Sequence, residues 1–150
     1  MKFTPSKLNT FLFFKLPSAY LSGVRVKSIT DTQCEVSVTH RWINQNPFKS
    51  MYFAVQAMAA ELTTGALVMH QIQKSGRKIS MLVLSNKSSF TKKATGRIVF
   101  CCNEGKQIEE TINKALQTGQ GQTCWVRSVG VNQKGEQVSE FEFEWTIKVK

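Results

Sequence analysis

One carboxylate stands alone in the middle of an apolar stretch of the chain. Between Lys49 and Lys74 the sequence contains a single formally charged side chain, that of Glu61. A buried carboxylate without a partner costs free energy, and proteins respond by pairing it, hydrating it or raising its pKa. A carboxyl group kept in such a place beside a cleft is a candidate general base or nucleophile. The alternative is an ion pair between Glu61 and an arginine or lysine of a neighbouring strand.

The residues around Glu61 predict one long helix. Large apolar side chains occur on every side of this helix and do not form a single stripe, which indicates burial on most sides. They are Phe53, Met58, Leu62, Leu67 and Met69. Many of the intervening residues are alanine or glycine, so a sheet can approach the helix backbone closely. Residues 44–73 therefore predict a central helix wrapped by β-structure.

The other segments predict the strands of that sheet and two further helices. A short helix starts at Pro5 and is closed by Pro17 and Gly23, and a surface helix covers residues 106–119. Strands are predicted over residues 24–29, 34–42, 79–84, 97–102 and 124–131, and after a turn at residues 133–136. In the last strand, apolar residues from Phe141 to Val149 alternate with polar ones. This order favours an α+β fold, with an antiparallel sheet of about six strands around the central helix in a single domain of residues 1–150.

The composition of the chain indicates which classes of partner it could bind and in which cellular compartment it could reside. The net charge of +10 and the pI of about 9.7 favour an anionic partner, such as nucleic acid, acidic lipid headgroups or a phosphorylated coenzyme. The four cysteines have no CxxC spacing, so no metal site is expected, and free cysteines are typical of a reducing cytoplasm. No apolar run approaches the length of a membrane span, so we expect a soluble, unprocessed, cytoplasmic protein.

The element order and the central segment resemble the hotdog superfamily of acyl-CoA thioesterases and dehydratases. In the branch typified by phenylacetyl-CoA thioesterases, the helix opens with His-Gly-Gly, and a catalytic Asp lies nine residues after that His. Without a gap, Tyr52 here takes the place of the His, Ala54 that of the second Gly, and Glu61 that of the Asp. Loss of the His-Gly-Gly sequence is the main departure, and it concerns the positioning of the substrate.

The chain resembles more closely an uncharacterised thioesterase-like branch of that superfamily, domain of unknown function 4442. In this branch an Arg-x-x-Asn stretch leads to a small residue and then to a helix ending in Ala-Glu-Leu-x-x-Gly. The matching residues are Arg41, Asn44 or Asn46, Ser50, Ala60, Glu61, Leu62 and Gly65.

The resemblance implies hydrolysis of an acyl-CoA or acyl-carrier-protein thioester, with Glu61 as base or nucleophile. The backbone N–H groups of Phe53, Ala54 and Val55 would hold the developing oxyanion at the helix N-terminus. Asn46 would orient the water or the thioester carbonyl, and its alternative role is that of a turn or cap residue.

Substrate-binding roles follow for a second group of residues, which are Asn44, Ser50, Tyr52, Lys92, Lys93 and Arg97. The basic members of this group would meet the phosphates of coenzyme A, although a solvated surface is the alternative meaning of such residues. Coenzyme A enters only as part of the substrate, and no cofactor is implied.

Two other functions stay open, and the fold also implies an assembly. A non-catalytic acyl-thioester-binding protein is one alternative. A basic nucleic-acid-binding module is the other. The aromatic residues Phe141, Phe143 and Trp145 disfavour it, because they lie on the predicted core face and cannot stack on bases. The fold implies a homodimer or a dimer of dimers, in which Ala57, Ala60 and Gly65 let the central helices lie side by side.

Overall fold

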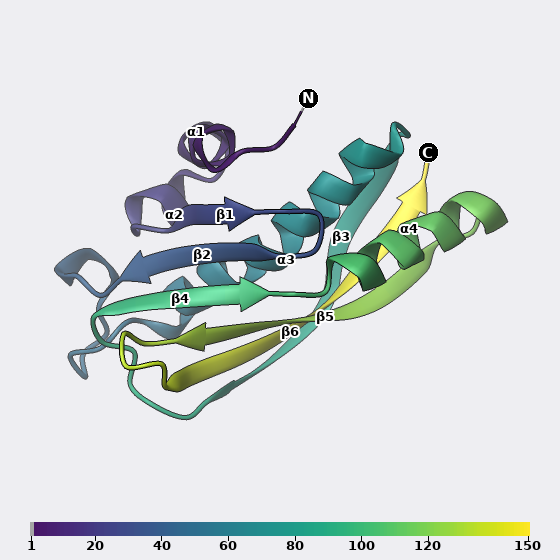
Figure 1. Cartoon of the computed structure of the whole chain (residues 1–150). Helices are drawn as coiled ribbons and strands as arrows, with labels where there is room; N and C mark the ends of the chain where they lie inside the picture. Colours follow the sequence, from purple (N-terminus) through teal and green to yellow (C-terminus); the bar gives the residue numbers. More distant parts are fainter. Residues whose placement is uncertain (1) are drawn as a thin grey trace.

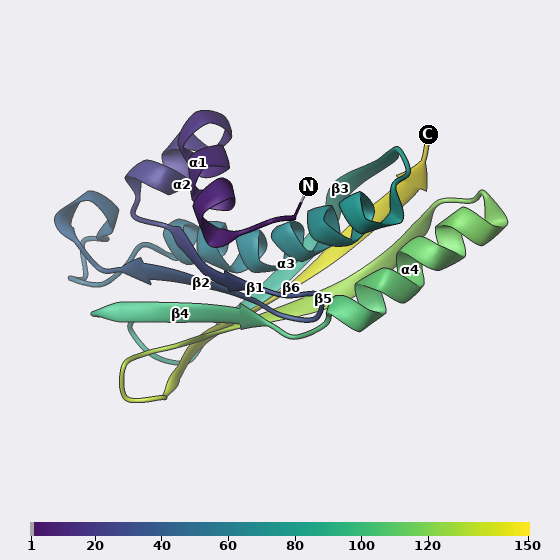
Figure 2. The ribbon, with the colours of Figure 1, turned by 45° about the horizontal axis from the view of Figure 1, so that its top comes forward.

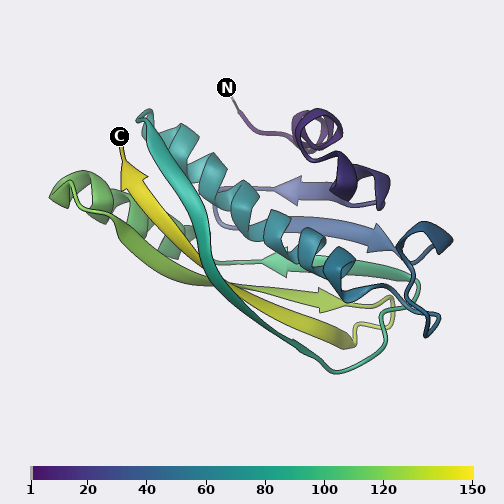
Figure 3. The same cartoon turned by 180° about the vertical axis from the view of Figure 1, so that it is seen from behind.

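A long helix, α3 (Phe53–Ser75), lies across one face of a six-stranded sheet in the computed structural model, which describes residues 2–150 (Figures 1 and 3). The strand order is β1–β2–β4–β5–β6–β3, and every neighbouring pair is antiparallel. The strands are β1 (Arg25–Ile29), β2 (Cys34–Thr39), β3 (Ile79–Phe90), β4 (Arg97–Cys102), β5 (Gln122–Val131) and β6 (Gln137–Val149). The predicted α+β architecture with a sheet around a central helix is therefore confirmed.

Three smaller helices and a 3₁₀ turn complete the fold. They are α1 (Pro5–Lys15), α2 (Pro17–Leu21), η1 (Trp42–Asn44) and α4 (Gly105–Thr118). The amide of Asn9 bonds both backbone groups of Val26, at 2.8 and 3.1 Å, and so fastens α1 to the edge strand β1. Figure 2 shows α1 and α2 beside β1, whereas α4 lies toward the other end of the molecule.

The small residues of α3 lie against the sheet of the same chain. Ala59, Ala60 and Gly65 are buried, and two hydroxyl contacts fix the helix to the strands. Thr63 Oγ1 donates to Ser128 Oγ at 2.8 Å, and the indole N–H of Trp145 donates to Thr64 Oγ1 at 3.0 Å. Ala60 and Gly65 thus pack against the sheet of their own chain. The sequence analysis had placed them against the central helix of a second chain, and in the structure they do not face outward for that contact.

A narrow stripe of α3 stays partly exposed. Ala54, Ala57, Met58 and Glu61 recur every three or four residues along it, which places them on one side of the helix. Among residues 2–150, no helix has both the length and the hydrophobicity needed to span a membrane.

At the ends of two strands the structure differs from the sequence prediction by three residues or more. β2 ends at Thr39, because the next residues turn into η1, and β3 continues to Phe90 where the prediction ended it at Leu84. The far half of β3 is rich in serine and lacks apolar alternation, yet it pairs with β6 along its whole length. The alternation predicted for β6 is confirmed, since its apolar residues from Phe141 to Ile147 are buried.

Candidate active site

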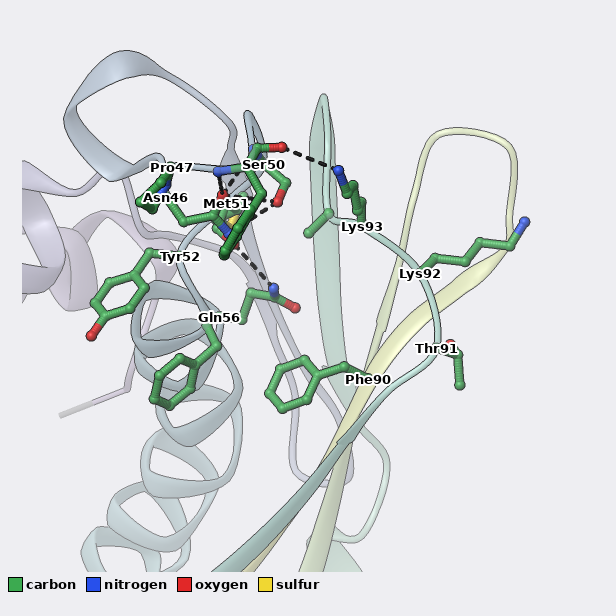
Figure 4. Close-up of a pocket in the computed structure, with 13 residues that line it drawn as sticks. Asn46, Pro47, Ser50, Met51, Tyr52, Gln56, Phe90, Thr91, Lys92 and Lys93 are labelled. Carbon is green, nitrogen blue, oxygen red and sulfur yellow. Dashed lines mark hydrogen bonds between the residues drawn. The ribbon is translucent and has the colours of Figure 1, made fainter.

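A pocket of about 490 Å³ opens at the N-terminus of α3 (Figure 4). Its size falls within the range of small-molecule sites. It lies between the loop that precedes α3 and the segment that links β3 to β4. The lining residues are Asn46, Pro47, Phe48, Ser50, Met51, Tyr52, Phe53, Gln56, Phe90, Thr91, Lys92, Lys93 and Ala94.

Asn46 holds the loop before α3 in a tight turn. Its Oδ1 accepts from the backbone N–H groups of Phe48, at 2.9 Å, and Ser50, at 3.2 Å. Its Nδ2 donates to Ser50 Oγ at 3.0 Å, and Lys49 between them adopts a left-handed φ of 59°. The side chain of Asn46 therefore stabilises a turn, which was the predicted alternative to a role in orienting water or substrate. This turn forms part of the pocket wall.

Asn44 and Arg97 are not brought to this pocket. Asn44 is buried, its Oδ1 accepts from the N–H of Arg41 at 2.7 Å, and its Nδ2 donates to the carbonyls of Ser22 and Thr39 at 2.9 Å. These bonds engage both hydrogens of the amide and its oxygen, so it fastens the end of β2 to α2. Arg97 starts β4 opposite Thr39, outside the pocket lining.

Two of the three predicted oxyanion donors are free. Within residues 2–150, the backbone N–H groups of Phe53 and Ala54 have no acceptor. The N–H of Val55 donates to the carbonyl of Tyr52 at 3.0 Å, which removes it from the predicted set. The two free donors lie at the positive end of the dipole of α3, where a developing anion is stabilised.

Of the two lysines at the pocket, one is directed toward the loop and one away from it. Lys93 Nζ donates to the carbonyl of Phe48 at 3.2 Å, at the rim of the pocket. The ammonium of Lys92 pairs with Glu136 and points away from the pocket in Figure 4. That bond is the main cause that lowers the pKa of Glu136. Lys93 is therefore the better placed of the two for an anionic group of a ligand.

Glu61 lies outside this pocket, farther along α3. Eight residues separate it from Phe53, which corresponds to about 12 Å along the helix axis. A Cβ built on Gly65 would lie 3.2 Å from Glu61 Oε1 and 3.3 Å from Trp145 Cζ2, so the carboxylate and the indole both pack against this glycine.

The carboxylate of Glu61 has neither a hydrogen bond nor an ion pair within residues 2–150. The predicted alternative, an ion pair with a strand arginine or lysine, is therefore not formed in this part of the chain. Burial raises the pKa of Glu61 above its ordinary value. An accessible carboxyl group with a raised pKa is suited to general-base chemistry near neutral pH.

Seven of the thirteen residues that line the pocket were missed by the sequence analysis, among them Gln56, Phe48 and Phe90. Gln56 is buried one turn after Phe53, and its Oε1 accepts from Ser139 Oγ at 2.7 Å. The sequence did contain a signal for Gln56, because it is the only polar residue of α3 before Glu61. Phe48 and Phe90 had none, because each reaches the pocket only through the folding of the loop and the full length of β3.

Metal ligands do not gather in the structure. Over residues 2–150, no group of three or more His, Cys, Asp or Glu side chains lies close enough together to hold a metal ion.

Comparison with known families assigns the chain to a family. Residues 6–147 match the family described as Domain of unknown function (DUF4442). The chain belongs to the DUF4442 family. No curated protein matches this DUF4442 chain in sequence.

Solved structures share the fold of the DUF4442 chain over nearly its whole length. A protein of unknown function from Pseudomonas aeruginosa, described as a probable thioesterase, has a TM-score of 0.81 at 21% identity, covering 100% of this chain and 99% of its own. A protein of unknown function from Chlorobaculum tepidum has a TM-score of 0.83 at 15% identity, covering 98% of each chain. A thioesterase from Haemophilus influenzae has a TM-score of 0.74 at 10% identity, covering 99% of this chain and 93% of its own. The DUF4442 chain thus has the hotdog fold of thioesterase-like proteins, as the resemblance implied.

Proposed function

We propose that this protein hydrolyses an acyl thioester carried by coenzyme A or by an acyl carrier protein. The observation that carries the proposal is Glu61, a half-buried carboxylate with no partner within residues 2–150 and a raised pKa, on the central helix of a hotdog fold. The relatives named as thioesterases support a thioester as the substrate.

The residues support hydrolysis by a water molecule. The carboxylate of Glu61 takes a proton from water, and the water oxygen bonds to the thioester carbonyl carbon. The carbonyl electron pair moves to oxygen, where the N–H groups of Phe53 and Ala54 stabilise the charge. The carbonyl then re-forms, the C–S bond breaks, and the thiolate leaves and takes up a proton. As a nucleophile, Glu61 would instead form an acyl anhydride that water hydrolyses in a second step.

A second copy of the chain completes the site in this proposal. The separation of about 12 Å along α3 keeps Glu61 from reaching a carbonyl held at Phe53 of the same chain. β3 is an edge strand of twelve residues, with Leu82 65% and Leu84 57% exposed, and such an edge invites pairing. Antiparallel pairing of two β3 strands runs the two α3 helices in opposite directions. Glu61 of each chain then lies toward the helix N-terminus of the other, and the proposed state is a homodimer or a dimer of dimers.

The coenzyme or carrier portion of the substrate would bind at the rim of the pocket. Lys93 supplies a positive charge there for a phosphate group, and Tyr52 and Phe53 expose aromatic rings beside it. Lys92 contributes less, because Glu136 neutralises it.

The test is thiol release from a panel of acyl-CoA thioesters. Glu61→Gln should lower kcat by about 10²–10⁴-fold, the usual contribution of a general base, while the protein stays folded. Glu110→Gln, which removes an exposed carboxylate on α4, is the matched control and should leave the rate unchanged. Equal rates for Glu61→Gln and the wild type would refute the assignment. Binding of acyl-CoA without any thiol release by the wild type would indicate a non-catalytic binding protein.

A further inference from the structure

Large apolar side chains gather at one end of the molecule, on α1, α2 and η1 and on the residue that links α1 to α2. They are Phe13, Phe14, Leu16, Leu21, Trp42 and Ile43, with exposed fractions that reach 66% for Leu21, 71% for Phe14 and 83% for Trp42. We call these six residues the apolar end. A group of exposed apolar side chains of this kind on a globular protein marks an interaction surface. We propose that the apolar end binds the surface of an anionic lipid bilayer.

Local contacts hold the three elements of the apolar end together. The rings of Phe13 and Tyr20 meet edge to face at 5.1 Å between centroids, which joins α1 to α2. The amide of Asn44 donates to the carbonyl of Ser22 at 2.9 Å, which joins η1 to the end of α2. In Figures 1 and 2, α1, α2 and the segment after β2 lie toward the same end of the molecule. The exposed side chains therefore stand on elements that are joined to one another at the same end of the molecule.

The charges around the apolar end are positive. Residues 2–30 contain five lysines and arginines and no acidic residue, and residues 36–60 contain Arg41 and Lys49 and likewise no acidic residue. Lys15 ends α1, and Arg41 directly precedes η1. Two acidic residues, Asp31 and Glu35, fall between these stretches. Asp31 is bound at the far end of α3 by His70 at 2.8 Å and Lys74 at 3.0 Å. Glu35 lies near the start of β2, the end of that strand away from η1, and accepts from Ser28 Oγ at 3.3 Å. Anionic headgroups would thus find basic residues and no nearby carboxylate.

This chemistry matches a lipid interface more closely than a nucleic acid. Tryptophan and phenylalanine favour the headgroup level of a bilayer, and aliphatic side chains partition into the acyl boundary beneath it. Lysine and arginine beside them are attracted to anionic lipid. Leu16, Leu21 and Ile43 could not stack on bases, which is what aromatic residues contribute to single-strand binding.

The proposed dimer leaves the apolar end uncovered. β2, which leads into η1, is four strand positions from the β3 edge, or about 19 Å across the sheet. The edge strand β1, against which α1 packs, is farther still. The pocket wall at Pro47 and Phe48 follows η1 in the chain, so the pocket opens close to the docked membrane. Docking does not depend on catalysis, and it can be tested separately.

Sedimentation with lipid vesicles tests the proposal. The wild type should bind vesicles of phosphatidylcholine with phosphatidylglycerol, bind pure phosphatidylcholine weakly, and be released partly by salt. The triple variant Phe14→Ser/Leu21→Ser/Trp42→Ser should lower the partition coefficient at least about tenfold. Trp125→Ser, which removes a partly exposed aromatic side chain on β5, is the control and should bind as the wild type does.

Two charge variants separate a local surface from general attraction. Lys15→Glu/Arg41→Glu should weaken binding by about fivefold or more for each residue changed. Lys106→Glu/Lys114→Glu changes the net charge equally but acts on α4, away from the apolar end, and should have a much smaller effect. Equal losses for the two pairs would overturn the proposal in favour of non-specific charge attraction.

The remaining outcomes are also decisive. Circular dichroism shows whether the triple variant folds. If it does not, the conservative variant Trp42→Phe replaces it. Brominated lipid should then quench the part of the wild-type tryptophan fluorescence that Trp42→Phe lacks. No vesicle binding by the wild type would overturn the proposal. A wild type that does not bind vesicles but binds a labelled oligonucleotide would also overturn it, if the triple variant loses that binding. The same holds for a wild type that does not bind vesicles but self-associates, if the triple variant loses self-association. Those last results would assign the apolar end to nucleic acid or to a second copy of the chain.

Discussion

Glu61 occupies a position that is unfavourable for its charged form. Its carboxylate packs near Gly65 and the indole of Trp145, and within residues 2–150 no cation or hydrogen-bond donor compensates for the lost water. Burial raises the pKa, so the folded state binds the proton more tightly than the unfolded state does. The ionised carboxylate therefore destabilises the fold at pH values above the raised pKa. This cost starts to decline as the pH falls through the raised pKa, and it is gone only below the ordinary pKa of a glutamate.

Glu61→Gln should accordingly stabilise the protein at neutral pH while it abolishes activity. The gain should appear as a higher Tm, by about 2–4 °C for each kcal/mol in a chain of this length. It should shrink as the pH is lowered through the raised pKa, because both side chains are then neutral. Thermal unfolding over a pH series measures this, with Glu110→Gln as an exposed control. A Tm that falls in Glu61→Gln at neutral pH would show that the carboxylate has a stabilising partner.

Gly65 keeps room for the carboxylate. In Gly65→Ala the new Cβ would lie 3.2 Å from Glu61 Oε1 and 3.3 Å from Trp145 Cζ2, both closer than ordinary contact, so the carboxylate and the indole must each shift by a few tenths of an ångström. Alanine is favoured over glycine in a helix by about 1 kcal/mol, which offsets the crowding. We expect a Tm close to that of the wild type and a kcat lower by roughly tenfold.

Gly121→Ala is the control for that substitution, since its Cβ would meet nothing nearer than 3.8 Å. Steady-state kinetics and thermal melts on both variants decide the matter. An unchanged kcat in Gly65→Ala would mean that the position of the carboxylate is not critical.

The sequence allowed some of these residue-scale features to be predicted and hid others. The isolation of Glu61 is visible in the sequence because no other charge occurs from Ser50 to Gln73. The role of Gln56 depends on Ser139, which lies 83 positions away along the chain. Asn44 and Asn46 could not be told apart, because each has a short amide side chain and only the folded loop decides what it bonds.

At the scale of elements, the N-terminus of α3 supplies the proposed oxyanion site. Tyr52 precedes the helix with φ −61° and ψ 134°, which is the conformation that a following proline requires. Proline is also tolerated at the first position of a helix, where its missing N–H breaks no helical bond. Phe53→Pro therefore removes one oxyanion donor with little effect on the helix.

A pair of substitutions isolates this backbone donor. Phe53→Ala and Phe53→Pro both lose the exposed ring, but only the proline loses the N–H group. We expect kcat for Phe53→Pro to be lower than for Phe53→Ala by about 10²–10³-fold, the usual effect of one oxyanion donor. Circular dichroism should show the same helix content in both. Equal kcat values would exclude the N–H of Phe53 from the oxyanion site.

Strands with alternating apolar and polar residues along their whole length could be predicted from the sequence. Strands that form because a neighbouring strand supplies their hydrogen bonds could not. β6 alternates along its length because one face is core and the other solvent, so its buried residues follow from the sequence. The outer half of β3 has no such alternation, and it is a strand because β6 supplies its hydrogen bonds. Missing that half of β3 also meant missing Phe90 in the pocket.

At the scale of the whole molecule, one chain contains both halves of the proposed site but keeps them apart. The pocket is lined by Phe53, which Ala54 follows in the helix, and lies at one end of α3, whereas Glu61 lies about 12 Å farther along. The sequence could indicate a dimer through the resemblance alone, since pairing of an edge strand leaves no pattern in the residues that form it. We therefore expect each active site to be shared between two chains.

Subunit complementation tests this claim most directly. Glu61→Gln and Phe53→Pro are each expected to be nearly inactive alone, one lacking the base and the other a donor. If the two chains are refolded together, each mixed dimer has one site with both defects and one site with none. Random mixing should then restore about one quarter of the wild-type rate of acyl-CoA hydrolysis, because half of the dimers are mixed and half of their sites are intact. A rate no greater than that of the two parent variants, with mixed dimers demonstrated by mass, would contradict a site shared between two chains.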